Sequence, residues 1–129
     1  MAQKYIIGDL VKYKVGGLEF IAEITNTSKY GYCFKGVSDD ISGTLCKEFA
    51  KDIPLTPEIL EKNGWKDDGY DWYRLPTKRA YLYITKDITT LGEFLVCVGL
   101  DRHNLASINF VHQLQHLLFG LGLNSEMEV

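Results

Sequence analysis

The sequence lacks the features that mark several common classes of protein. Three cysteines, Cys33, Cys46 and Cys97, lie far apart in a chain of 129 residues and form no Cys-x-x-Cys pair. This spacing gives no support to a disulfide framework, a zinc site or a redox dithiol, and it predicts three buried thiols. No stretch approaches the roughly 18 consecutive apolar residues of a membrane span, and the first residues lack the apolar core of a secretion signal. We therefore expect a cytoplasmic protein.

Positive charge is also scarce. The 14 Lys and Arg residues are outnumbered by 17 Asp and Glu residues, and the formal net charge is −3. A protein that covers nucleic acid with a broad surface usually has clustered Lys and Arg, so the charge disfavours such a partner. Hydrophobic residues make up 46% of the chain, which is enough for a real core. The length predicts a single domain over 1–129.

Short alternating segments dominate the first part of the chain, separated by turns rich in Gly and Asn. Strands are expected there at 10–14, 18–25, 30–35 and 43–49. Strands of this length and spacing predict a small SH3-like barrel or a rolled antiparallel sheet over 1–52. The remaining part of the domain, 53–129, contains further antiparallel strands. They are expected at 70–75, 79–85 and 93–100, after a turn at 66–69.

Two helices are expected beside these strands. Thr56 suits the cap and Pro57 the first helical position of a short helix over 57–63. A longer amphipathic helix is expected at about 105–121, where apolar residues recur every three or four positions. Leu114 lies at the centre of its apolar face and should be buried. Together, the strands and helices define an α+β fold.

Two motifs resemble those of a known family. They are Ile-Pro-Leu-Thr-Pro-Glu-Ile-Leu-Glu-Lys-Asn-Gly-Trp at 53–65 and Phe-Val-His-Gln-Leu-Gln-His-Leu-Leu-Phe at 110–119. The pairing resembles a family of small uncharacterised proteins encoded by phages, prophages and mobile elements of gut bacteria. The resemblance implies a mobile-element origin and a bacterial host cell. It implies no chemistry, because that family has no established activity. This sequence has His116 where the family usually has Asn.

His112 and His116 lie one helical turn apart on the predicted C-terminal helix, which is the spacing of two zinc ligands. Gln113 stands where metalloproteases have Glu, and no third ligand is marked by its spacing. We therefore expect no bound metal and no cofactor. The histidines are instead assigned with Asn109 and Gln113 to a polar helix face. On this interpretation His112 caps a neighbouring strand or loop, or the whole face meets another subunit.

Aromatic and basic residues interleave along the strands expected in the second part of the chain. The candidate binding residues are Trp72, Tyr73, Arg74, Arg79, Tyr81 and Tyr83, together with His112 and His116. Rings and cations interleaved on a sheet can stack the bases of single-stranded nucleic acid. The alternative is that the rings fill the core and a subunit interface. The acidic net charge favours this alternative.

No complete set of catalytic residues can be assembled from the sequence. There is no nucleophile motif, and Cys97 lies in an apolar run where thiol reactivity falls. We expect a non-enzymatic accessory protein of a phage or mobile element, which acts as a protein-interaction module on a protein partner or on a second copy of itself. The alternative function is a single-stranded nucleic-acid or nucleotide binder that uses the strands within 70–83.

Overall fold

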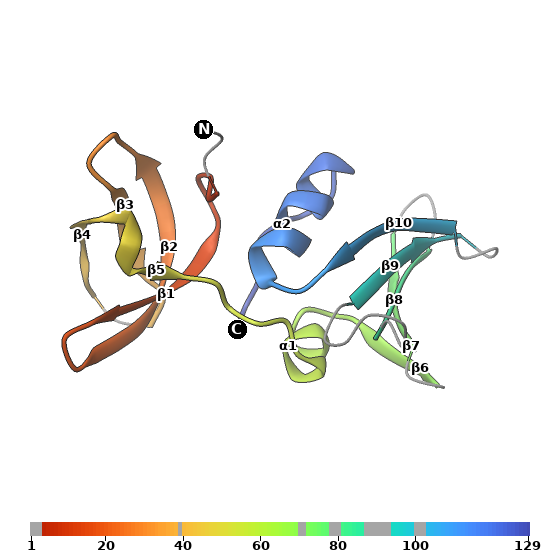
Figure 1. Ribbon diagram of the computed structural model, residues 1–129. Coiled ribbons are helices and arrows are strands. Elements are labelled where there is room, and N and C mark those ends of the chain that lie inside the picture. Colours follow the sequence, from red (N-terminus) through yellow and green to blue (C-terminus); the bar gives the residue numbers. More distant parts are fainter. Residues whose placement is uncertain (1–3, 39, 70–71, 78–80, 87–93, 100–102) are drawn as a thin grey trace. The chain divides into compact units, whose positions relative to one another are not determined.

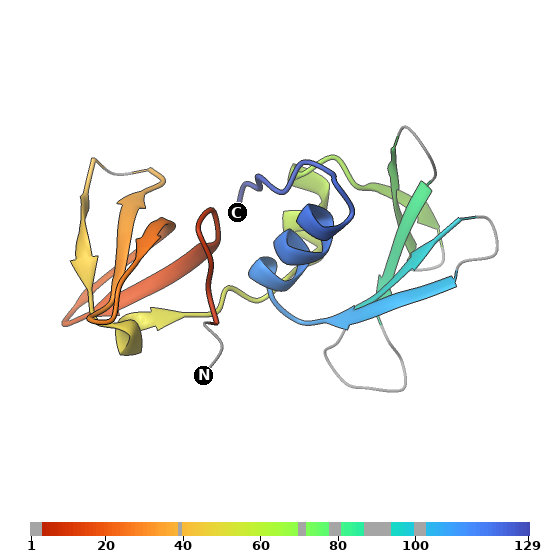
Figure 2. The same ribbon diagram turned by 90° about the horizontal axis from the view of Figure 1, so that it is seen from above.

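The computed structural model describes residues 4–38, 40–69, 72–77, 81–86, 94–99 and 103–129. The chain divides into two compact units (Figures 1 and 2). The first unit contains Met1–Ile53 and Phe110–Met127, and the second contains Pro54–Asn109 and the last two residues. In sequence, the second unit therefore interrupts the first. The expectation of a single domain over the whole chain stays a prediction.

The first unit holds a five-stranded antiparallel sheet in the order β4-β3-β2-β1-β5. Its elements are β1 (Leu10–Val15), β2 (Leu18–Thr27), β3 (Tyr32–Gly36), β4 (Ser42–Leu45), the 3-10 turn η1 (Lys47–Phe49), β5 (Ala50–Lys51) and helix α2 (Val111–Gly120). In the second unit, a second five-stranded antiparallel sheet has the order β10-β9-β8-β7-β6. Its elements are helix α1 (Pro57–Lys62), β6 (Lys66–Gly69), β7 (Trp72–Pro76), β8 (Tyr81–Lys86), β9 (Phe94–Val98) and β10 (His103–Ile108).

These elements confirm the predicted α+β fold with antiparallel sheets. Within the described residues, neither sheet closes on itself, because β4 and β5 remain at the edges of one sheet and β6 and β10 at the edges of the other. The SH3-like barrel expected over 1–52 is therefore not confirmed.

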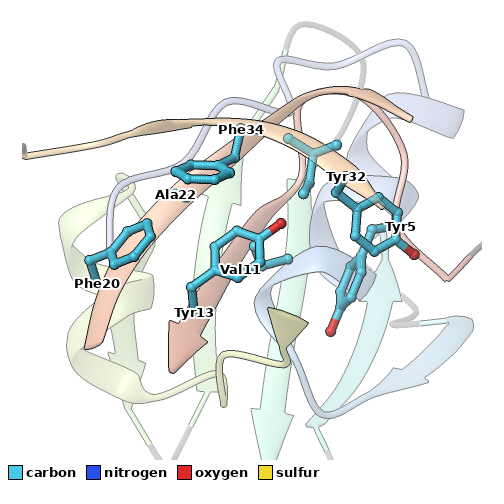
Figure 3. Close-up of a cluster of buried hydrophobic side chains, with 8 residues drawn as sticks. Tyr5, Val11, Tyr13, Phe20, Ala22, Tyr32 and Phe34 are labelled. Atoms are coloured by element: carbon cyan, nitrogen blue, oxygen red, sulfur yellow. The ribbon is translucent and has the colours of Figure 1, made fainter. Parts of the chain in front are cut away.

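Alternation of side chains along the strands builds the core of the first unit (Figure 3). Val11 and Tyr13 of β1 lie opposite Ala22 and Phe20 of β2, and all four side chains are buried. The ring of Phe34 in β3 packs against those of Tyr13 and Phe20, with centroids 4.9 and 5.4 Å away. Such tilted aromatic contacts add to the free energy gained from burial of apolar area.

The C-terminal helix begins later than the predicted 105–121. Residues 105–108 belong to β10, where Ile108 pairs with Phe94 of β9 and is buried. Phe110 then adopts an extended conformation, and α2 begins at Val111. The apolar residues before Phe110 serve a sheet instead of a helix face, because the neighbouring strand β9 supplies backbone partners that the local spacing did not reveal.

Three further expectations can be compared with the structure. Helix α1 agrees with the predicted 57–63 to within one residue, and the Ile59 N–H donates to Thr56 Oγ1 at 3.2 Å, as expected of the cap. The strand expected at 43–49 ends at Leu45 and gives way to η1. The segment 66–69, expected to be a turn, forms β6, because β7 pairs with it.

Candidate functional site

One face of the second sheet collects aromatic and cationic side chains. Residues directly opposite each other in antiparallel strands have side chains on the same face. The strand register therefore places one row of side chains across the sheet on a single face. From β6 to β10 this row consists of Lys66, Arg74, Tyr83, Cys97 and Asn104.

Trp72 and Tyr81 belong to the same face, because they alternate with Tyr73 and Leu82 along β7 and β8. We define the aromatic face as Lys66, Trp72, Arg74, Tyr81 and Tyr83. Lys66 is exposed, and Tyr81 keeps 43% of its surface exposed. Trp72 and Arg74 are half-buried, and Tyr83 is buried. The face therefore presents two cations and two rings over a buried Tyr83.

The side chains of the aromatic face contact one another directly. The Trp72 ring meets the Tyr83 ring edge-on, with centroids 6.3 Å apart, and the Tyr81 and Tyr83 centroids are 6.4 Å apart. The guanidinium carbon of Arg74 lies 5.0 Å from the centroid of Tyr81, within the range of a cation–π interaction. Arg74 Nη1 lies 3.9 Å from Asp68 Oδ1, and both side chains are partly exposed. That ion pair is consequently a weak one.

The structure thus brings together four of the predicted binding residues: Trp72, Arg74, Tyr81 and Tyr83. Tyr73 instead lies opposite Ile84, on the other face of the sheet, where Ile84 is fully buried. Arg79 lies outside the described residues. The remaining member of the face, Lys66, was missed because its strand was expected to be a turn.

A second group of polar side chains lies inside the first unit and contains both predicted histidines. We call Tyr5, Asp9, Asp52, His112 and His116 the histidine cluster. His116 Nε2 lies 2.7 Å from Asp9 Oδ2, and the Asp9 side chain is only 2% exposed. The same carboxylate oxygen accepts the N–H of Ile6 at 2.8 Å. This pair therefore links α2 to the segment that precedes β1.

The second half of the cluster is built around Asp52, which follows β5. Asp52 accepts hydrogen bonds from the Tyr5 hydroxyl at 2.5 Å and from Lys4 Nζ at 2.9 Å. Burial and the adjacent carboxylate raise the pKa of Tyr5 well above its ordinary value of 10.0. Burial acts to raise the pKa of Asp52, but the hydrogen bonds from Tyr5 and Lys4 outweigh it and hold that pKa below 3.8. Asp52 is therefore an anion that accepts from a neutral tyrosine.

His112 occupies the interior of the cluster. Its side chain is 6% exposed, and its Nδ1 lies 3.8 Å from Asp52 Oδ1, too far for a hydrogen bond. The buried Nδ1 has no hydrogen-bond partner. The His112 ring packs against the rings of Tyr5 and His116, with centroids 4.9 and 5.6 Å away. Burial lowers the pKa of His112 below 6.5, and it outweighs the attraction of Asp52 and Asp9.

The predicted polar helix face is in part an interior face. His112 and Gln115 are both buried, whereas Phe119 of the same helix is 70% exposed. Gln115 accepts the Leu10 N–H at 2.9 Å and donates to the carbonyl oxygens of Gly8 and Ser125 at 3.0 and 3.1 Å. These bonds satisfy the buried Leu10 N–H and two partly buried carbonyls, so Gln115 fastens the helix to its own unit.

Neither group brings together a set of metal ligands. In the part of the chain that the structure describes, no three His, Cys, Asp or Glu side chains are grouped so that they could hold a metal ion. The carboxylates of the histidine cluster already accept bonds from Tyr5, Lys4, Ile6 and His116. The cluster is thus arranged to hold elements together, and the aromatic face is the better candidate for an external ligand.

Comparisons with protein-family models, with curated proteins and with solved structures give no match for this chain. None of the helices among the described residues has the length and apolar character needed to cross a membrane.

Proposed function

We propose that this protein is a non-enzymatic interaction module that binds a partner protein through the aromatic face. The observation that carries the proposal is the placement of Trp72, Arg74 and Tyr81 together on one face. Trp, Tyr and Arg are the residues most enriched at the energetic centres of protein interfaces. Tyr83 beneath them is buried and in contact with both other rings, which supports a rigid surface.

The edges of the same sheet are poorly suited to pairing with a strand of another chain. Strand β6 carries Lys66, Asp67 and Asp68 and has a register irregularity before Gly69. At the other edge, β10 has an irregularity between Asn104 and Ala106. Charged residues and bulges on edge strands oppose edge-to-edge association. A partner is therefore expected on the face and not at an edge.

The partner is expected to be a different protein. A symmetric dimer formed through the aromatic face would bring the same patch of two copies together. Such a dimer would enclose the Lys66 and Arg74 cations of both copies in one interface. This repulsion disfavours self-association through the aromatic face.

Binding of single-stranded nucleic acid is the alternative function, and the same rings and cations favour it. Against it stands the charge of the second unit, which has more Asp and Glu than Lys and Arg residues. Two further expectations remain proposals: the mobile-element context in a bacterial cytoplasm, and an SH3-like barrel in the first unit. The strand order β4-β3-β2-β1-β5 supports the latter.

The test uses two exposed tyrosines that each lie beside a cation. Tyr81 lies 5.0 Å from the Arg74 guanidinium carbon, and Tyr30, in a turn of the first unit, has Lys29 Nζ 5.1 Å from its centroid. Tagged wild type, Tyr81→Ser and Tyr30→Ser are expressed in bacterial host cells, and the bound proteins are quantified. Each partner found is then purified and its affinity for the three chains is measured.

We expect the partner to bind wild type and Tyr30→Ser with equal affinity and Tyr81→Ser at least about tenfold more weakly, the usual loss at an interface hot spot. Equal binding by all three chains would refute the proposal. Fluorescence anisotropy with a single-stranded oligonucleotide supplies the competing outcome. If the oligonucleotide binds wild type with a strong salt dependence and loses affinity on Tyr81→Ser, the alternative function is correct.

A further inference from the structure

The aromatic face contains two cations in an unfavourable arrangement. Lys66 of β6 and Arg74 of β7 are direct partners in the antiparallel register. Side chains in such pairs have Cβ atoms roughly 5 Å apart, and like charges at that separation destabilise a sheet. An arrangement of this kind is favourable when an anion lies between or above the two cations.

The neighbouring Asp68 neutralises Arg74 incompletely. Its Oδ1 is 3.9 Å from Arg74 Nη1, beyond hydrogen-bond distance, and the two side chains keep 28% and 38% of their surface exposed. The Nε of Arg74 is buried and has no hydrogen-bond partner. Because that Nε has no exposed surface, an oxyanion from outside would be bound by the Nη groups of Arg74, whose side chain is 38% exposed.

Tyr81 holds the guanidinium in place. The guanidinium is planar and lies over the Tyr81 ring, which limits its movement, and its fork of N–H groups matches the two oxygens of a carboxylate or phosphate. Trp72 adds a half-buried ring on the same face. The site thus combines a planar cation, a second flexible cation and an apolar wall.

We propose that Lys66 and Arg74 bind carboxylate groups of an acidic segment in the partner protein. This inference rests on the proposed function and names the chemistry of its partner. Asp68 already places a carboxylate near Arg74, which supports a carboxylate as the ligand. Asp68 beside the site would repel the closely spaced phosphates of a nucleic acid more strongly than it would repel single carboxylates.

The experiment follows the Nε–H signal of Arg74 by NMR during titration of the full chain. The sequence has only three arginines, so assignment by substitution is direct. The probes are an acetylated tetraglutamate peptide, the matching tetraglutamine peptide, inorganic phosphate and a single-stranded oligonucleotide. The chains are wild type, Arg74→Lys, Lys66→Gln and, as a matched control, Lys29→Gln, which removes the cation beside Tyr30.

We expect tetraglutamate to shift the Arg74 signal saturably in wild type and Lys29→Gln, while tetraglutamine leaves it unchanged. In Arg74→Lys the affinity, followed through the Tyr81 ring signals, should fall about tenfold although the charge is kept, because the planar fork is lost. Lys66→Gln should weaken binding by a smaller factor.

Three results would overturn the inference. They are equal shifts with both peptides, no shift with tetraglutamate, and a response to phosphate or oligonucleotide while tetraglutamate has no effect. A further result would overturn this inference and leave the proposed function standing. If the cellular partner is lost on Tyr81→Ser but retained at full affinity by Arg74→Lys, the aromatic face is an interface and the acidic partner is wrong.

Discussion

Mild acid should destabilise the first unit through His112. The pKa of this buried histidine lies below 6.5 in the folded protein, because burial disfavours its charged form. An unfolded chain exposes the ring, so below pH 6.5 the unfolded state binds a proton that the folded state does not. The free energy of unfolding therefore falls as the pH falls from 6.5 to the folded-state pKa, and it is unaffected by this group above that range.

The size of this loss in the free energy of unfolding follows from two opposing contributions to the energy of protonated His112. A protonated His112 would gain about 4 kcal/mol from Asp52 at 3.8 Å, for a partly screened pair. Removing a charge from water costs several kcal/mol, and no hydrogen bond to Nδ1 offsets that cost. Asp52 is already engaged by Tyr5 and Lys4. Desolvation should therefore prevail, and stability should be lost at up to about 1.4 kcal/mol per pH unit within the window.

The assay is urea unfolding between pH 7.5 and 5 of wild type and His112→Gln, which keeps a polar, uncharged side chain. Contributions from other groups cancel in the difference between the two slopes. The substitution should flatten the decline even if it lowers stability at every pH. Equal slopes, or an NMR titration that places the His112 midpoint at or above 6.5, would show that Asp52 closes on the ring and that the reasoning is incorrect. Asp52 also contributes to the free energy of unfolding while it is ionised, because its pKa is lower in the folded protein. That contribution should be lost separately, as the pH falls through 3.8 and below.

Two pairs of substitutions test the packing of the first unit. Leu114→Ala should lower the free energy of unfolding by about 2–5 kcal/mol, because Leu114 is fully buried, whereas Leu121→Ala, at 44% exposure, should change it by less than about 0.5 kcal/mol. Gly31→Ala should cost at least about 1–3 kcal/mol, because its Cβ would lie 2.0 Å from the carbonyl oxygen of Leu45, while Gly43→Ala meets Phe34 at 3.8 Å and should be tolerated. Denaturant titration measures both pairs, and equal losses within either pair would contradict the packing described.

The elements that could be predicted from the sequence are those whose signals are local. The Thr56–Pro57 cap fixes the start of α1, and the alternation over 18–25 identifies most of β2. The start of α2 could not be predicted in this way. Apolar residues spaced by three or four positions occur at 105–108 as well, and only pairing with β9 assigns that segment to a sheet. Pairing with β7 likewise makes 66–69 a strand, because the sequence Lys-Asp-Asp-Gly alone favours a turn.

The candidate binding residues also differ in whether a local signal in the sequence could place them. Period-two alternation in β7 and β8 is enough to place Trp72, Arg74, Tyr81 and Tyr83 on one face once those strands are paired. The partners of the histidines could not be found from spacing. His116 and Asp9 are separated by 107 residues, and Asp52 contributes from a third segment. No local pattern predicts such contacts, since they depend on how α2 packs on the first sheet.

The polar residues near α2 and the cations of the aromatic face differ in how far partners within their own unit compensate them. This difference decides where binding is expected. Asp9, Asp52 and Gln115 each form bonds within the first unit, at distances of 2.5–3.1 Å. Substituting them should therefore affect stability first. On the aromatic face the Asp68 carboxylate stands 3.9 Å from Arg74, and Lys66 lies opposite the same cation. Among the described residues, neither cation of the aromatic face forms an ion pair shorter than 3.9 Å, and an external ligand explains such cations better than folding does. Arg74 and not His116 is therefore the residue on which the binding proposal depends.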